Sequence, residues 1–164
     1  MIDFWNKTLW QQYGATIDML ENAIIACPDD LWDQESKFWY IAYHTLFFLD
    51  YHLTADAATF FPPEPFTMSE MDPSGLMPDR TYNKNELLTY LEHCREKCYS
   101  LIKGLTQQSA EQFVVNSYKK EYSILEILLY NMRHVQHHIA QLHLLLRQSG
   151  NEPPAWVSRA NKEY

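Results

Sequence analysis

The stretch Asn131-Met-Arg-His-Val-Gln-His-His-Ile-Ala-Gln-Leu142 decides both the fold class and the candidate site of this chain. It places His134 and His138 four residues apart, a spacing that sets two side chains one turn apart on the same face of an α-helix. On a helical wheel the arc around the two histidines is mainly apolar, whereas His137 and His143 point elsewhere; the arc holds Ile124, Ile127, Asn131, Val135, Leu142 and Leu145. The pattern predicts a helix whose two imidazoles face an apolar interior, where a metal ion could bind both.

A third histidine lies in a second apolar stretch, Trp39-Tyr-Ile-Ala-Tyr-His-Thr-Leu-Phe-Phe-Leu49. If the two helices pack side by side, His44 joins His134 and His138 inside one bundle. Three protein ligands would leave a metal position vacant, as in catalytic metal sites. The alternative is that the three histidines are ordinary hydrogen-bonded core residues.

Hydrophobic periodicity predicts four helices, over about 3–26, 36–55, 83–103 and 123–150. Asn83 with Glu86 and Ser123 with Glu126 form capping-box patterns at the start of the third and fourth helices. Gly150 suits a helix C-terminus. We therefore expect an all-α fold, a four-helix bundle with a long connection between helices two and three, formed by residues 1–164 as a single domain.

The long connection, about 56–82, is rich in proline and aromatic residues. Such a segment is either a strap that seals the end of the bundle or a strap that also serves as a lid. Beyond the last helix, the run Pro153-Pro-Ala-Trp156 is expected to place an aromatic side chain against the bundle.

Composition narrows the function classes. The chain has 164 residues, is 46% hydrophobic and carries a net charge of -8, which makes nucleic acid a poor partner. We expect no membrane span or signal peptide, and the odd cysteine count fits a reducing, cytoplasmic setting.

Cys94 and Cys98 could bind metal or sense redox state, but buried core thiols are the favoured interpretation. We interpret His52 and His93 as structural or surface groups.

Two familiar metal motifs are absent from the sequence. No glutamate is followed by histidine three residues later, as di-iron bundles require. Val135 stands where a zinc protease has its catalytic glutamate.

The chain resembles the DinB-like superfamily of metal-binding four-helix bundles, which includes relatives of bacterial thiol transferases. The resemblance lies in the Trp-x-x-x-x-His run that ends at His44 and in the pattern from His134 to Gly150. It also covers the run from Arg80 to Tyr90 and the closing Pro153-Pro-Ala-Trp156. Many relatives have Arg-Gly after the second ligand histidine, where this chain has Ile139-Ala140. We expect this difference to keep the ligands and to alter local packing or the partner helix.

The resemblance implies that His44, His134 and His138 bind a divalent metal ion, zinc or nickel first among them, in a homodimeric protein. It favours a metal-dependent enzyme that transfers a low-molecular-weight thiol to a small electrophilic substrate, with metal-dependent hydrolysis also open. On the helical wheels Tyr40, Tyr51 and Gln141 lie beside these histidines and could contact them or a substrate. The residues define no general base.

Two non-enzymatic hypotheses stay open. One is a metal- or ligand-binding bundle without catalysis. The other is a homodimeric scaffold that uses the off-core residues Leu125, Leu129 and Leu144 as its interface.

Overall fold

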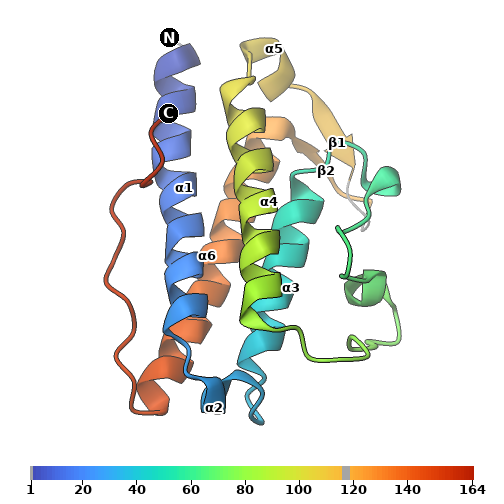
Figure 1. Cartoon of the computed structure of the whole chain (residues 1–164). Coiled ribbons are helices and arrows are strands. Elements are labelled where there is room, and N and C mark those ends of the chain that lie inside the picture. Colours follow the sequence, from blue (N-terminus) through green and yellow to red (C-terminus); the bar gives the residue numbers. More distant parts are fainter. Residues whose placement is uncertain (1, 116–118) are drawn as a thin grey trace.

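The structure is a computed structural model that describes residues 2–115 and 119–164. Within these ranges it has four long helices, α1 (Ile2–Ala26), α3 (Phe38–His52), α4 (Lys84–Lys103) and α6 (Ile124–Gln148), so the predicted all-α fold is confirmed (Figure 1). Short elements connect them: α2 (Asp29–Trp32), the 3₁₀ helices η1 (Ala57–Thr59) and η2 (Met68–Met71), α5 (Gln107–Ala110), and the strands β1 (Phe113–Val115) and β2 (Glu121–Ser123).

The four long helices form a ring in the order α1, α4, α3, α6. In this arrangement α3 packs mainly against α6, and α1 packs mainly against α4. The interior is unusually aromatic, and Trp10, Tyr13, Phe38, Tyr43 and Phe47 are all fully buried. The neighbouring placement of α3 and α6 sets the two histidine-bearing helices side by side, as the sequence predicts.

The helix ends follow local sequence chemistry. At the start of α4, Asn83 and Glu86 exchange the two hydrogen bonds of the predicted capping box. Ser123 accepts a hydrogen bond from the Glu126 amide at the start of α6. At its other end the amides of Gly150 and Asn151 bond back to the carbonyls of Arg147 and Leu146. This is a Schellman ending, and it uses the positive φ of Gly150.

The second long helix is shorter than the predicted 36–55. Lys37 has a φ of 50°, outside the helical region, so α3 begins only at Phe38. At the other end α3 stops at His52, where the Thr54 hydroxyl bonds to the Asp50 carbonyl. The final turn tightens there, because the Leu53 amide bonds to the Asp50 carbonyl three residues back.

The long connection between α3 and α4 is an ordered strap. Phe60 and Phe66 are buried, as the sealing interpretation predicts. Phe66 stacks on Tyr43 and on Tyr90, with ring centroids 5.8 Å and 4.5 Å apart. The strap is therefore anchored to both α3 and α4 by an aromatic plug.

A small hairpin precedes α6 and was not predicted from the sequence. β1 pairs antiparallel with β2, with Val114 opposite Tyr122. Its exposed residues Phe113 and Val115 give it little core of its own, and β2 leads directly into the Ser123 cap.

The segment after α6 runs back along α1 (Figure 1). The Ala160 amide bonds to the Gln11 carbonyl at 2.9 Å, and the Trp10 indole bonds to the Lys162 carbonyl at 2.8 Å. The prediction for Trp156 was wrong, since this side chain is 70% exposed. The tail is instead held by backbone hydrogen bonds and by Ala160, which packs against the core.

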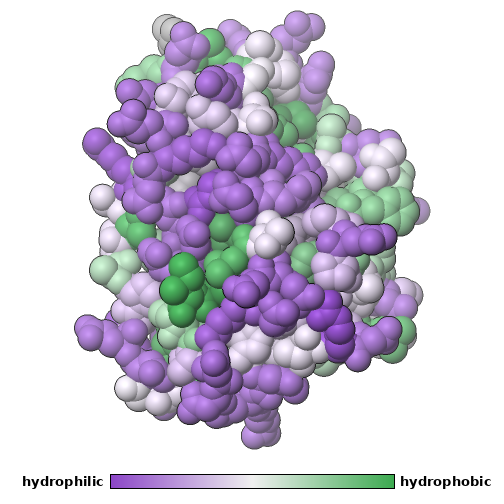
Figure 2. Space-filling model, viewed as in Figure 1, coloured by the Kyte–Doolittle hydropathy of each residue, from purple (hydrophilic) through white to green (hydrophobic). Residues whose placement is uncertain are grey.

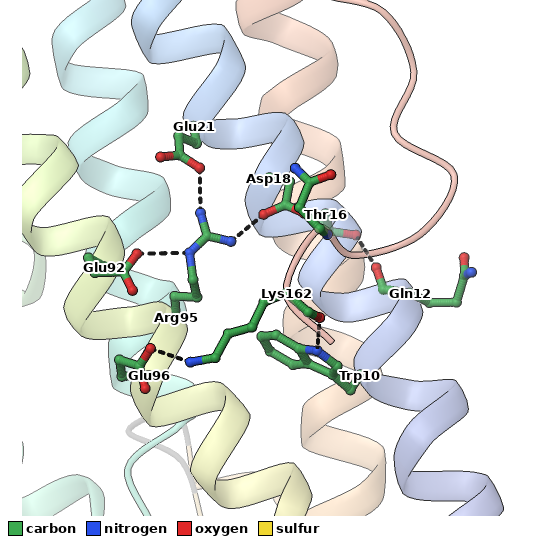
Figure 3. A network of polar contacts seen from close by, with 10 residues as sticks. Trp10, Gln12, Thr16, Asp18, Glu21, Glu92, Arg95, Glu96 and Lys162 are labelled. Carbon is green, nitrogen blue, oxygen red and sulfur yellow. Dashed lines mark hydrogen bonds and ion pairs between the residues drawn. The ribbon is translucent and has the colours of Figure 1, made fainter. Parts of the chain in front are cut away.

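An ionic network joins the tail to α1 and α4 (Figure 3). The buried Arg95 guanidinium bonds to Asp18 and Glu21 of α1 and to Glu92 of its own helix. The other carboxylate oxygen of Asp18 accepts a hydrogen bond from the Asn161 backbone amide at 2.7 Å. Because each buried charge has several partners, the desolvation cost of burying Arg95 and Asp18 is offset. The face of the molecule seen in Figure 2 is mainly hydrophilic, with a compact apolar patch left of its centre and smaller apolar areas elsewhere.

Gly14 is required where the tail crosses α1. A Cβ atom at this position would lie 2.6 Å from the Ala160 Cβ atom. We expect Gly14→Ala to displace the tail and to lower the free energy of unfolding by about 1–3 kcal/mol, the usual cost of overpacking. Urea unfolding would measure this loss, and the double variant Gly14→Ala with Ala160→Gly should recover part of it. Equal stability of Gly14→Ala and wild type would contradict the close approach.

Candidate metal centre

The three predicted ligand residues come together between α3 and α6. His44 projects from the middle of α3, and His134 and His138 project from successive turns of α6. The ring centroid of His44 lies 4.7 Å from that of His138 and 5.5 Å from that of His134. One nitrogen atom from each ring falls within 4.8 Å of the others. The group could therefore hold a divalent metal ion.

The histidines lie at the edge of the core, whereas the sequence placed His134 and His138 in its interior. The fully buried stripe of α6 includes Val135, Ile139 and Leu142, and all three histidines of the group are only half-buried. On a wheel at about 100° per residue, the centre of that stripe lies about 90° from His134. This position leaves one side of the cluster open to solvent, which a substrate would need.

The positions and protonation of the ring nitrogens of His134 and His138 indicate whether a cation fits between them. The Nε2 atoms of His134 and His138 are 3.1 Å apart. The Nδ1 atom of His138 lies 2.7 Å from the Gln141 carbonyl oxygen, so Nδ1 carries the proton and Nε2 carries the lone pair. The Nδ1 atom of His134 is buried and has no hydrogen-bond partner among the described residues. A donor set of convergent neutral imidazoles fits a divalent transition metal.

Burial keeps the two α6 imidazoles in the form that binds metal. It lowers the pKa of His134 to about 3, with His138 and His44 adding to the effect as nearby positive groups when protonated. Burial also lowers the pKa of His138, although the hydrogen bond to Gln141 acts in the opposite direction. Both rings are thus neutral at pH 7, and a metal ion need not displace a proton from them.

Glu70 is a site residue that the sequence did not indicate. Its Oε2 atom lies 2.6 Å from the Nδ1 atom of His44, and its side chain is 3% exposed. The residue belongs to η2 in the strap, 26 positions from His44, and no helical spacing connects the two. In the sequence, the one indication of a role for Glu70 is that it is a carboxylate within the long connection, which is a candidate lid.

Three residues were expected beside the ligands. Tyr40 approaches His44 with a ring centroid distance of 6.4 Å, and Gln141 binds His138 as described above. Burial and the hydrogen bond to Glu70 raise the pKa of Tyr40 to about 12, so its hydroxyl stays protonated. Tyr51 is buried, and its ring packs on those of Phe48 and Phe60.

The other candidates take structural places. Cys94 and Cys98 are fully buried, and burial raises the pKa of both thiols, which agrees with core filling. His93 lies on α4, 3.6 Å from the buried Asp50 carboxylate, and is not part of the histidine group between α3 and α6. His52 packs against Tyr130 and lies at the margin of the histidine group, 6.3 Å from the His134 ring.

Fold and site together define a helical bundle with a three-histidine centre between its second and fourth long helices. The family model described as the DinB family matches residues 6–164, and the chain belongs to this family. No curated protein matches the chain. Within the described residues, no helix has both the length and the apolar character needed to cross a membrane.

The geometry separates His137 from its neighbours. We expect His134→Ala and His138→Ala each to weaken zinc binding by more than the roughly 10- to 100-fold that loss of an outer partner costs. His137→Ala should bind zinc as wild type does, because this side chain is exposed and its polar contact is with the Gln141 amide, at 3.4 Å. Competition titration with a chromophoric chelator measures all three affinities. Equal losses in the three variants would show that the ligand assignment is wrong.

Burial of His52 predicts a pH dependence of stability. Burial lowers its pKa to about 4, whereas an imidazole in the unfolded chain titrates near 6.5. Below pH 6.5 the unfolded state therefore binds more protons, and stability is lost as the pH falls from about 6.5 toward 4. In metal-free protein, His52→Phe should lose less stability between pH 7 and pH 5 than wild type does, as measured by urea unfolding. Parallel pH profiles of the two proteins would argue against a buried neutral His52.

Proposed function

We propose that this DinB-family protein is a metal-dependent enzyme, in which His44, His134 and His138 bind one divalent ion. The observation that supports it is the convergence of three imidazoles at the open edge of the core. Structural metal sites are normally closed by four protein ligands, whereas catalytic sites keep a position free. Zinc or nickel is the ion that family membership suggests; imidazole nitrogen suits both, as it also suits copper and iron.

A divalent ion bound there would lower the pKa of a coordinated water or thiol toward neutrality. Burial keeps the imidazoles of His134 and His138 neutral, while Gln141 and Glu70 contact the rings of His138 and His44 and orient them. The three histidines are only half-buried, so the group is in contact with solvent.

Family membership favours thiol transfer as the reaction. In this proposal the sulfur of a low-molecular-weight thiol forms a bond to an electrophilic carbon of a small substrate. The leaving group departs with its bonding electrons, and the thiol proton passes to solvent. Attack by water on an ester or amide is the second possible reaction of the same centre.

A non-catalytic homodimeric bundle is the alternative function. Leu125, Leu129 and Leu144 on α6 are 42%, 43% and 53% exposed, so apolar side chains are available for a second copy of the chain. Large exposed apolar residues on one helix are typical of interaction surfaces. In this alternative the histidine group binds a metal or ligand without turning it over.

Metal content tests the leading proposal. Tag-free wild type should contain about one divalent ion per chain by elemental mass spectrometry, and His44→Ala should lose it. The loaded wild type should then couple a small thiol to an electrophile faster than the metal-free protein does. A metal-free wild type after reconstitution would refute the proposal, and a loaded but inactive protein with a dimeric mass would favour the alternative.

A further inference from the structure

We propose that Glu70 is a positioning residue of the metal centre, carried to it by the strap. Its carboxylate would fix the His44 ring so that Nε2 faces His134 and His138. The inference rests on the proposed function, since it assumes that the three histidines bind an ion. It assigns to the long connection a part in the site itself.

The contact between Glu70 and His44 is short and shielded. The Nδ1 to Oε2 distance is 2.6 Å, and the Glu70 side chain is 3% exposed while that of His44 is 28% exposed. A charge-assisted hydrogen bond gains strength where water is excluded. With Nδ1 donating to the carboxylate, the lone pair of His44 lies on Nε2, the nitrogen that remains for a metal.

Tyr40 lies beside His44, on the helix that faces Glu70. Tyr40 and His44 are four residues apart on α3, so both side chains leave the same face of the helix. The Tyr40 ring lies 6.4 Å from that of His44, so Tyr40 borders the Glu70–His44 contact. The second carboxylate oxygen of Glu70, Oε1, is buried and has no hydrogen-bond partner among the described residues, so the contact of Oε2 with His44 is the one that orients the carboxylate.

The strap delivers Glu70 in a fixed position. Four residues before Glu70, Phe66 is stacked between the Tyr43 and Tyr90 rings. Between them, the Tyr43 hydroxyl donates to the Thr67 carbonyl at 2.8 Å. These contacts come from the core of the bundle, so the position of η2 is set by the fold and is present before a metal arrives.

The residues that contact His44 and His138 differ in charge. Gln141 offers His138 a neutral carbonyl oxygen, whereas Glu70 offers His44 a carboxylate. A carboxylate makes the imidazole a better donor to a cation and offsets part of the metal's charge. The Glu70–His44 contact should therefore affect metal affinity more than fold stability, which separates this role from that of a simple ion pair.

Cobalt(II) serves as the probe, because it reports both affinity and ligand set through its visible absorption. Glu70→Gln should bind Co²⁺ about 10- to 100-fold more weakly than wild type, the range found for outer partners of metal ligands. At saturating Co²⁺ its absorption band should match that of wild type, since the ligands are unchanged. Tyr40→Phe should show a smaller loss in the same direction. Asp79→Asn, an exposed carboxylate on the same strap, is the matched control and should match wild type.

Several outcomes would overturn the inference. Equal Co²⁺ affinity of wild type and Glu70→Gln would show that Glu70 only closes the strap. A changed absorption band at saturation would make Glu70 a direct ligand. An equal loss in Asp79→Asn would attribute the effect to general charge. Wild type that binds no Co²⁺ would refute the proposed function itself, a result distinct from the others.

Thermal melting of the metal-free proteins separates positioning from folding. We expect Glu70→Gln and Tyr40→Phe, which keep side-chain volume, to melt close to wild type. A large drop in the melting temperature of both variants, with proportionate loss of Co²⁺ binding, would count against positioning.

Discussion

One hydrogen bond between α3 and α6 fixes the geometry on which the candidate centre depends. The side-chain amide of Asn131, a fully buried residue, donates to the Leu49 carbonyl at 2.9 Å. Leu49 lies in the last turn of α3, where carbonyls lack an intrahelical partner, and the Leu53 amide turns to Asp50 instead. Asn131 thus completes the end of a neighbouring helix, and it sets the register of α6 against α3. The histidines one and two turns further along α6 then face His44.

The two halves of the bundle use charge differently. Between α1 and α4, the buried Arg95 is balanced by carboxylates and tied to the tail through Asp18. Between α3 and α6, burial acts on neutral imidazoles and lowers the pKa of His134 and His138. A closed ionic network holds one side of the molecule together. The opposite side brings three half-buried imidazoles together at the edge of the core.

The sequence predicted what periodicity controls and missed what depends on tertiary contacts. The helices and the pairing of His134 with His138 follow from side-chain spacing within one segment, and His44 follows from the apolar character of its own helix. Glu70 could not be found in this way, because its approach to His44 depends on where Phe66 docks. The burial of Trp156 was wrongly predicted for a related reason. Backbone hydrogen bonds hold the tail on α1, and the missing side chain of Gly14 lets Ala160 pack closely there. The α3 boundaries moved because Lys37 adopts a left-handed conformation that propensity alone does not reveal.

The separation of the ligands along the chain gives the centre a place in the order of folding. During synthesis His44 emerges well before His134 and His138, and more than half of the chain lies between the first ligand and the second. A partly made protein therefore carries only one of the three candidate ligands, and the complete set exists once α6, the last long helix, has docked on α3. Metal capture would then act as a late checkpoint, which selects finished bundles over intermediates that still lack their final helix.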